Sequence, residues 1–367
     1  MALSRNYVIQ VASAAKETAY DTAATIDNRI NVNIGGIPRE VSQVVSDDDK
    51  VGGFEEATDA VVFARHVTYD LGINRVKPFA LGHFGAFGLG AVASAVADTG
   101  TPAITVKQHA CTPVANDGAL NSFTFEEFKT SEVKNKFSGG LVNTLNLSVT
   151  RGANRMVNMT AGIIASGTVA TGGAAVTEPA ETQLNASTAG VWLVPDALNV
   201  DYATAANRTQ NLDTTVYNLS GAVVDLKDLL RSVTWDFSNN ISPDDLYRVG
   251  GGLFLAVGQR SGRTQTLQLD FDYEGGSGEK QDAYVDALQS HTEYSFQMIV
   301  RGAEGSDENY YHGFSLIFPV MQLIDVEIAD DGGTLVNRTN WQIMDDDSSV
   351  HKSVYLDVFN EEAAYMA

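Results

Sequence analysis

The chain has 367 residues, of which 44 % are hydrophobic, and it carries 46 acidic residues against 24 basic ones. Its formal net charge of −22 argues against a conventional nucleic-acid binder, because neutralising phosphates requires Lys and Arg. No window approaches the roughly 18 consecutive apolar residues that a membrane-spanning helix needs. The length exceeds what one compact core usually holds and predicts two domains, or two similar units.

The N-terminal region is expected to form an arm over residues 1–53, with few residues anchored in a core, and its first apolar stretch is expected to be extended or a short strand. Its first apolar stretch is too short for a secretory signal and is interrupted by Gln10 and Ser13. The single cysteine, Cys111, cannot form a disulfide within the chain and fits synthesis in a reducing cytoplasm. We expect that side chain to be a buried small residue rather than a catalytic thiol.

A first β-rich unit is predicted over residues 54–175. It opens with an expected helix at 55–71, where apolar residues recur at spacings of three and four, and Gly72 would end that helix. Strands are expected at 104–106, at 123–125 and around 145–149, where apolar and polar residues alternate. Residues 176–214 are expected to be a linker or loop, because the region from 165 to 190 is rich in Ala, Thr, Ser and Gly.

A second unit is predicted over residues 215–367. Its expected strands lie at 229–237, 253–257, 267–273, 294–300, 314–328 and 354–359, and its expected helix lies at 279–291. The stretch 141–150 aligns with 229–238 in both apolar and small polar positions, which suggests an internal duplication. The predicted fold is therefore α+β and mainly β, with two antiparallel sheets that are each flanked by a helix.

Motifs that carry chemistry are weak in this sequence. The G-x-G-x-x-A pattern at 88–93 lacks the preceding buried strand that a dinucleotide site needs. The acidic clusters at 47–49 and 345–347 lack the spacing of an EF-hand loop, and the six histidines show no metal-ligand or triad spacing. We therefore expect no enzymatic activity, no cofactor and no metal.

Three segments together resemble the tail tube (major tail) proteins of bacteriophages with long, non-contractile tails. Residues 15–22 resemble the family's opening E-T-x-Y-G-T, with Asp21 in place of the usual glycine. Residues 120–127 resemble its L-x-S-F-T-I-E-x segment, and residues 137–145 its Y-S-G-x-K-V-N-x-L segment. The closing strands at 314–328, which contain Pro319, and at 354–360 also follow the family's pattern.

The resemblance implies a structural virion protein whose sheets join edge to edge into rings that stack as a hollow tube. Two units per chain would give a homotrimeric, pseudo-hexameric ring, assembled in the host cytoplasm and then part of the virion. DNA would pass through the lumen without specific binding, and the expected partners are tape measure, tail terminator and tail-tip proteins. The arm is the candidate for contacts between rings; its candidate residues are Tyr7, Ile9, Val11, Glu17 and Tyr20.

Two other readings stay open on the sequence alone. The chain could be another self-assembling phage component, such as a capsid or decoration protein. It could also be a β-rich enzyme or a carbohydrate-binding module. An enzyme should gather titratable residues in one pocket, and a carbohydrate binder should cluster exposed aromatic residues. The three tryptophans, Trp192, Trp235 and Trp341, are widely separated in the sequence.

Overall fold

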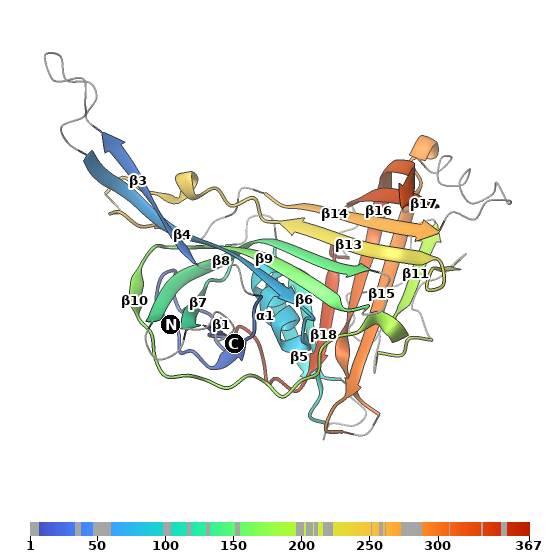
Figure 1. Cartoon of the computed structure of the whole chain (residues 1–367), viewed down its shortest axis with the longest axis horizontal. Helices are drawn as coiled ribbons and strands as arrows, with labels where there is room; N and C mark the ends of the chain where they lie inside the picture. The colour runs from blue at the N-terminus through green and yellow to red at the C-terminus, as the bar shows by residue number, and fades with distance from the viewer. Residues whose placement is uncertain are drawn as a thin grey trace, which may run out of the picture.

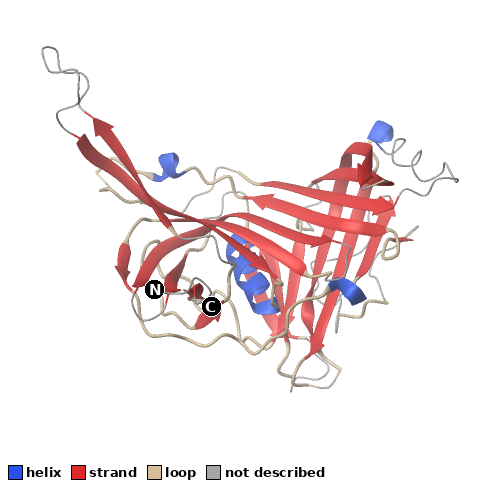
Figure 2. Ribbon diagram, in the orientation of Figure 1, coloured by secondary structure: helices blue, strands red, loops and turns tan. Residues whose placement is uncertain are grey.

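The structure is a computed structural model in which β-strands dominate (Figure 2). It describes residues 7–33, 38–46, 60–97, 104–115, 119–129, 133–150, 155–195, 202, 208, 212–215, 223–250, 252–256, 260, 262–272, 288–307, 309–331, 333–345 and 351–367.

The largest layer, which we call the central sheet, is an antiparallel array of eight strands. It runs across the upper part of the molecule in Figure 1. In spatial order its strands are β3 (Arg39–Ser46), β4 (Ala60–Asn74), β9 (Val157–Ala165), β8 (Val133–Thr150), β13 (Leu230–Ser238), β14 (Thr264–Asp272), β17 (Thr334–Ile343) and β16 (Tyr311–Asp331).

Two smaller layers continue from β8 and β16, because each of these long strands passes from one layer into another. The first outer sheet has the order β2 (Asn28–Ile30), β1 (Tyr7–Val11), β7 (Phe123–Lys129), the first half of β8, and β10 (Val169–Thr171). The second outer sheet has the order β12 (Val224–Asp225), β11 (Gly190–Pro195), β15 (Glu293–Glu304), the first half of β16, β18 (Tyr355–Asn360), β6 (Lys107–Pro113) and β5 (Gly90–Val96).

The helix α1 (Pro78–Leu89) lies beneath the central sheet and is buried along its whole length (Figure 1). Pro78 stands at its first turn, where no backbone N–H is needed, and Gly90 ends it in the left-handed conformation with φ 91°. A Cβ at Gly82 would lie 2.6 Å from the Tyr365 ring, and one at Gly85 would lie 2.7 Å from Leu356. The glycines of this segment thus allow close packing, and Gly88 lies inside the helix rather than after a strand.

The expected helix at 55–71 is wrong, because Ala60–Asn74 form the strand β4. Its burial alternates: Tyr69, Leu71 and Ile73 are buried, whereas Asp70 and Asn74 are exposed. Spacings of three and four were present by coincidence in a segment whose β-branched and aromatic residues favour a strand.

Other expectations for local structure have mixed outcomes. Strands are confirmed at 123–125, 145–149, 294–300 and 314–328, at 229–237 from residue 230, at 354–359 from residue 355, and at 267–273 up to residue 272. Residues 104–106 are not a strand, since β6 begins at Lys107, and in 253–256 only Phe254 forms an isolated bridge. Of the expected helix at 279–291, residues 288–290 are helical and 279–287 lie outside the described residues.

Two segments that we expected outside the core belong to it. In residues 1–53, the β1 side chains Ile9 and Val11 are buried in the main core, and β3 is part of the central sheet. In residues 176–214, β11 pairs with β15 and buries Trp192. Both corrections have the same cause, because a short apolar strand needs only a few residues to pair and bury one face.

Candidate functional site: the open face of the central sheet

One face of the central sheet covers the core, and most of the other carries short polar side chains; we call the latter the open face. Towards β4, Ile164 on this side packs with Ile241, Leu246 and Leu255 in a separate apolar cluster. On β13, Val233, Trp235 and Phe237 are buried, while Thr234 and Asp236 point the other way. The register extends this alternation across neighbouring strands, so polar residues stand opposite polar residues. Representative members of the open face are Asn74, Thr144, Asn146, Ser148, Asn158, Thr160, Ser232, Thr266, Gln268, Asn340 and Gln342.

The charged side chains of the open face are mostly acidic: Asp70, Asp236, Asp270, Asp325 and Glu327, against Arg39 and Arg338. Arg338 is shared between two carboxylates, since its Nε lies 3.2 Å from Asp270 and its Nη1 lies 3.7 Å from Glu327. At the margin, Arg231 and Asp272 form a further ion pair. The open face therefore carries an excess of negative charge.

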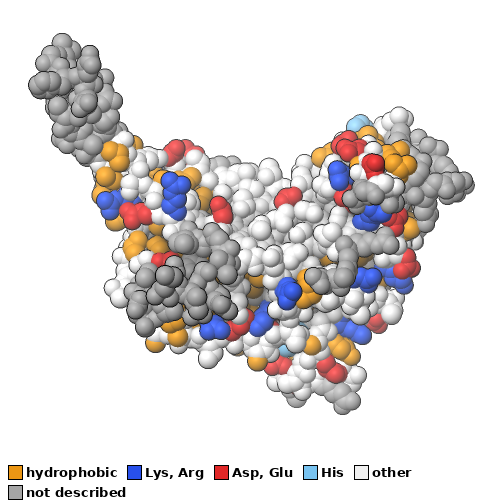
Figure 3. All heavy atoms as spheres, in the orientation of Figure 1, with side chains coloured by type: hydrophobic (Ala, Val, Ile, Leu, Met, Phe, Trp, Pro, Cys, Tyr) orange, Lys and Arg blue, Asp and Glu red, His pale blue; other side chains and the backbone are white. Residues whose placement is uncertain are grey.

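The middle of the open face is hollowed. A depression of about 320 Å³ lies over β8, β9, β13 and β14 and is lined by Thr144, Asn146, Asp236, Ser238 and Thr266, among others. Figure 3 shows the upper outline, between the projecting β3–β4 hairpin and the opposite end, as mostly uncharged with isolated acidic atoms. Such a surface offers hydroxyl, amide and carboxylate groups but few groups that would hold a phosphate.

The three segments that carry the family resemblance meet at one buried carboxylate, that of Glu17. It accepts hydrogen bonds from the Ser122 hydroxyl at 2.7 Å, the Thr124 hydroxyl at 2.6 Å and the Gly139 amide at 3.0 Å. The Asp21 amide donates to the same carboxylate at 3.1 Å. We call this arrangement the Glu17 latch, because it ties the N-terminal segment to β7 and β8.

Asp21, which stands where the family has glycine, adopts the left-handed conformation that glycine favours, with φ 64°. Its carboxylate accepts hydrogen bonds from the hydroxyls of Ser138, Ser166 and Thr168. Aspartate tolerates this conformation better than most residues, and its side chain adds contacts that glycine cannot make. The backbone at Asp21 is therefore held in a conformation that glycine also adopts.

The structure shows where the arm residues that were predicted to contact another ring lie. Ile9 and Val11 are buried in the main core and Glu17 in the latch, so their side chains are not available for a contact with another molecule. Tyr20 is half-buried; its pKa is raised by burial and by the neighbouring carboxylates of Asp21 and Glu17. The backbone of Tyr7 pairs with Lys129 in the first outer sheet.

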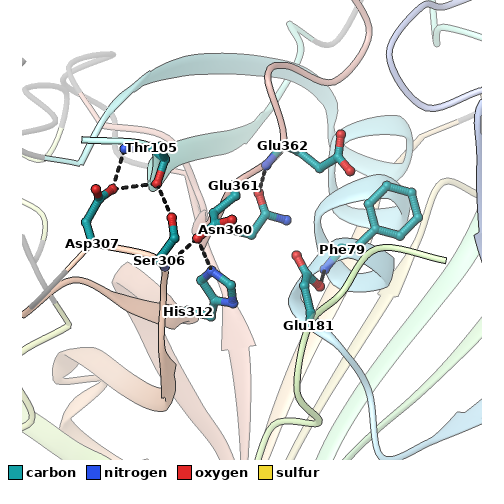
Figure 4. Close-up of polar contacts among 9 residues, drawn as sticks. All are labelled: Phe79, Thr105, Glu181, Ser306, Asp307, His312, Asn360, Glu361 and Glu362. Carbon is teal, nitrogen blue, oxygen red and sulfur yellow. Dashed lines mark hydrogen bonds and ion pairs between the residues drawn. The ribbon is translucent and has the colours of Figure 1, made fainter. Parts of the chain in front are cut away.

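A second polar cluster lies where the C-terminal segment meets the β15–β16 turn (Figure 4). Glu361 accepts the Ser306 amide at 2.6 Å, and its carboxylate lies 3.7 Å from Nε2 of His312. The Ser306 hydroxyl contacts Thr105 at 2.7 Å rather than the histidine. The Thr105 hydroxyl donates in turn to Asp307, and together these contacts fasten the turn to the residues before β6 and to the C-terminal segment.

Glu181 lies near this segment and accepts the Phe79 amide at 2.6 Å, at the start of α1 (Figure 4). Burial raises the pKa of its carboxyl to about 7, and the neighbouring Glu362 adds to the rise. The folded state thus binds a proton that the unfolded state releases at lower pH. This contribution to stability is complete below about pH 4.5 and is lost as the pH rises through about 7.

The variant Glu181→Gln should remove this pH dependence while keeping an acceptor for the Phe79 amide. Relative to the variant, the free energy of unfolding of the natural chain should fall by up to about 3 kcal/mol between pH 4.5 and 7.5. Urea titrations of both proteins at several pH values measure the difference. Parallel stability curves for the two proteins over that range would contradict the assignment.

Sequence reasoning missed most of this site. The open face is spread over strands that are far apart in the chain, and β9 and β17 were not predicted at all.

In the described part of the chain, no group of three or more His, Cys, Asp or Glu is placed to hold a metal ion. Within the same residues, no helix is long and apolar enough to cross a membrane. The chain matches no protein-family model, and no curated protein sequence matches it.

Proposed function

We propose that the chain is a structural subunit that joins edge to edge into rings, and that the rings stack into the hollow tail tube of a long-tailed bacteriophage. The observation that carries this proposal is the construction of the central sheet. It consists of two four-stranded sets, joined at the β8–β13 pair, with an acidic, hollowed open face and an apolar core beneath.

The two sets have the same strand order, which supports a duplicated unit. In the first set the order is β3, β4, β9, β8, and in the second it is β13, β14, β17, β16. In space, each set starts with two antiparallel neighbours and ends with a long strand. That long strand also pairs with the strand that precedes it in the chain: β8 with β7, and β16 with β15. The equivalent strands are thus β8 with β16 and β3 with β13.

This equivalence differs from the one suggested by the sequence alignment. The stretches 141–150 and 229–238 lie in β8 and β13, which occupy opposite ends of their sets and are hydrogen-bonded neighbours. Their similarity has a plainer cause, since both are half-buried strands with one face in the same core and the other on the open face.

The open face fits the lumen of such a tube. A ring of three copies would bring together chains with a formal charge of −22 each, and the acidic excess of the open face would line the channel. Like charge repels the DNA backbone, and short polar side chains offer it no base or phosphate contacts of the usual kind. DNA would therefore slide through without sticking. The subunits would assemble in the host cytoplasm and then be part of the virion.

Negative-stain electron microscopy of the purified chain, together with its native mass, tests the proposal. Hollow tubes or trimeric rings are expected. Closed shells would favour a capsid or decoration role instead. A chain that stays monomeric at high concentration, also when tape measure and tail-tip proteins are supplied as initiators, would overturn the proposal and favour a binding module or an enzyme.

A further inference from the structure

The central sheet ends in two edges that lie at opposite ends of the molecule (Figure 1). Among the described strands, β3 pairs only with β4, and residues 324–331 of β16 pair only with β17. Both ends carry exposed apolar side chains: Phe63 is 48 % exposed at one, and Ile324 and Ile328 are 50 % and 43 % exposed at the other. Long open edges with apolar side chains favour pairing with another strand.

The internal β8–β13 junction shows how the end of one set pairs with the start of the next. It is antiparallel, and Leu147 stands opposite Trp235 on the core side. On the open face, the Asn146 side-chain amide donates to Asp236 at 2.6 Å. If a second copy continues the sheet, its β3 should meet β16 in the same way, because β3 corresponds to β13 and β16 to β8.

Two matching β-bulges fix the register of this equivalence. β8 has a bulge between Val142 and Thr144, and β16 has one between Leu323 and Asp325. Each bulge lies close to the point where its strand enters the central sheet. Superposing the bulges places Asn146 on Glu327 and Leu147 on Ile328.

The ladder pairs then carry the equivalence across the sheet to β3. Asn146 pairs with Thr160, and Glu327 pairs with Arg338, so Thr160 of β9 is the equivalent of Arg338 of β17. Four residues further along each strand, Ile164 is the equivalent of Gln342. Their partners on the next strands are Thr68 and Thr266.

The last step reaches the edge strand. Thr68 pairs with Arg39, and Thr266 pairs with Asp236. Arg39 is therefore the equivalent of Asp236, and Pro38 the equivalent of Trp235.

We propose that β3 of one copy pairs antiparallel with β16 of the next copy in the register of the β8–β13 junction, so that Arg39 faces the neighbouring Glu327. This inference rests on the proposed ring assembly and adds its register. The internal Asn–Asp contact is replaced by an Arg–Glu pair of opposite charge, which is what a contact between separate copies needs for specificity. Pro38 would meet Ile328, which gives that exposed side chain an apolar partner.

Charge reversal tests the pairing in a double-mutant cycle. Glu327→Arg and Arg39→Glu should each raise the critical concentration for ring formation about tenfold or more, since each places like charges opposite one another. The double variant should return it to within about threefold of the natural chain. Reversing the exposed Asp225–Lys227 pair, whose charged atoms are 3.6 Å apart, is the matched control and should leave assembly unchanged.

A cross-link gives a second readout that does not depend on energies. The double variant Arg39→Cys, Glu327→Cys should form disulfide-linked chains in assembled rings under oxidising conditions, and Cys111 should not interfere because it is buried. The pair Arg39→Cys, Ile324→Cys should not. If the natural chain assembles, but the charge-reversed double variant does not recover assembly and the Arg39→Cys, Glu327→Cys cross-link does not form, the proposed register is wrong while the proposed ring assembly still holds. If the natural chain does not assemble at all, the proposed function fails with it.

Discussion

Replacing Glu17 with alanine should lower the free energy of unfolding by about 4 kcal/mol. The variant leaves two hydroxyls and the Gly139 amide without the carboxylate that they now donate to, and each unsatisfied buried donor costs about 1–3 kcal/mol. Glu17→Gln should cost about half as much, because its carbonyl oxygen keeps part of the acceptor set while its amide group opposes a donor. Urea denaturation at one protein concentration measures both.

An exposed carboxylate supplies the comparison for this result. Asp225→Asn makes the same carboxylate-to-amide change as Glu17→Gln, at a side chain that is 47 % exposed, and it should shift stability by less than about 0.5 kcal/mol. Hydrogen exchange locates the effect, since the Gly139 amide should lose protection in Glu17→Ala. A Glu17→Ala variant as stable as Asp225→Asn would show that the latch does not hold the N-terminal segment.

The latch also explains why three separated motifs occur together in this chain. Residues 15–22, 120–127 and 137–145 are distant in sequence, yet their polar side chains converge on the carboxylates of Glu17 and Asp21. A motif whose residues satisfy one another's hydrogen bonds in a buried site has a structural reason to be present as a set. Its role is to tie the N-terminal segment to β7 and β8.

Strands with one buried face could be predicted from the sequence. The alternation in β14 is complete, with Leu267, Leu269 and Phe271 buried, and β8 alternates in the same way from Thr144 to Ser148. Period-two patterning survives because one face meets the core and the other meets solvent. The mainly-β class followed from these segments.

The helix and the layering could not be predicted in this way. α1 is buried on all sides, so its sequence shows no apolar stripe and reads only as a Gly, Ala and Phe-rich stretch. β15 is buried on both faces from Tyr294 to Val300, and β16 changes layers partway along its length. The open face depends on the order in which these strands pair, and the alternation of apolar and polar residues within each strand does not specify that order.

Reversing the charge of the open face should make assembled tubes bind DNA. Asp70→Lys combined with Asp236→Lys changes four charges per chain, and in a ring of three copies the new lysines would form a repeated positive band around the channel. Cations on the wall can neutralise phosphates and release their counterions, so affinity should fall steeply as salt rises. Natural tubes should show little binding under the same conditions.

Tubes of the two proteins can be compared by fluorescence anisotropy of a labelled double-stranded DNA, titrated from about 50 to 200 mM salt, where phosphate-driven binding typically loses orders of magnitude. The control is Glu304→Lys with Asp307→Lys, which makes the same change in net charge at the far end of the β15–β16 hairpin, on the side opposite the open face in Figure 1. Because Glu304 accepts the Asn309 amide and Asp307 accepts the Thr105 amide, urea denaturation first checks that this control is as stable as the open-face variant. In virions, the open-face variant should slow or block DNA ejection while the control ejects normally. Equal DNA binding by the two variants would mean that total charge, and not the placement of acidic residues on the open face, governs the interaction. Normal ejection by the open-face variant would place this face away from the channel.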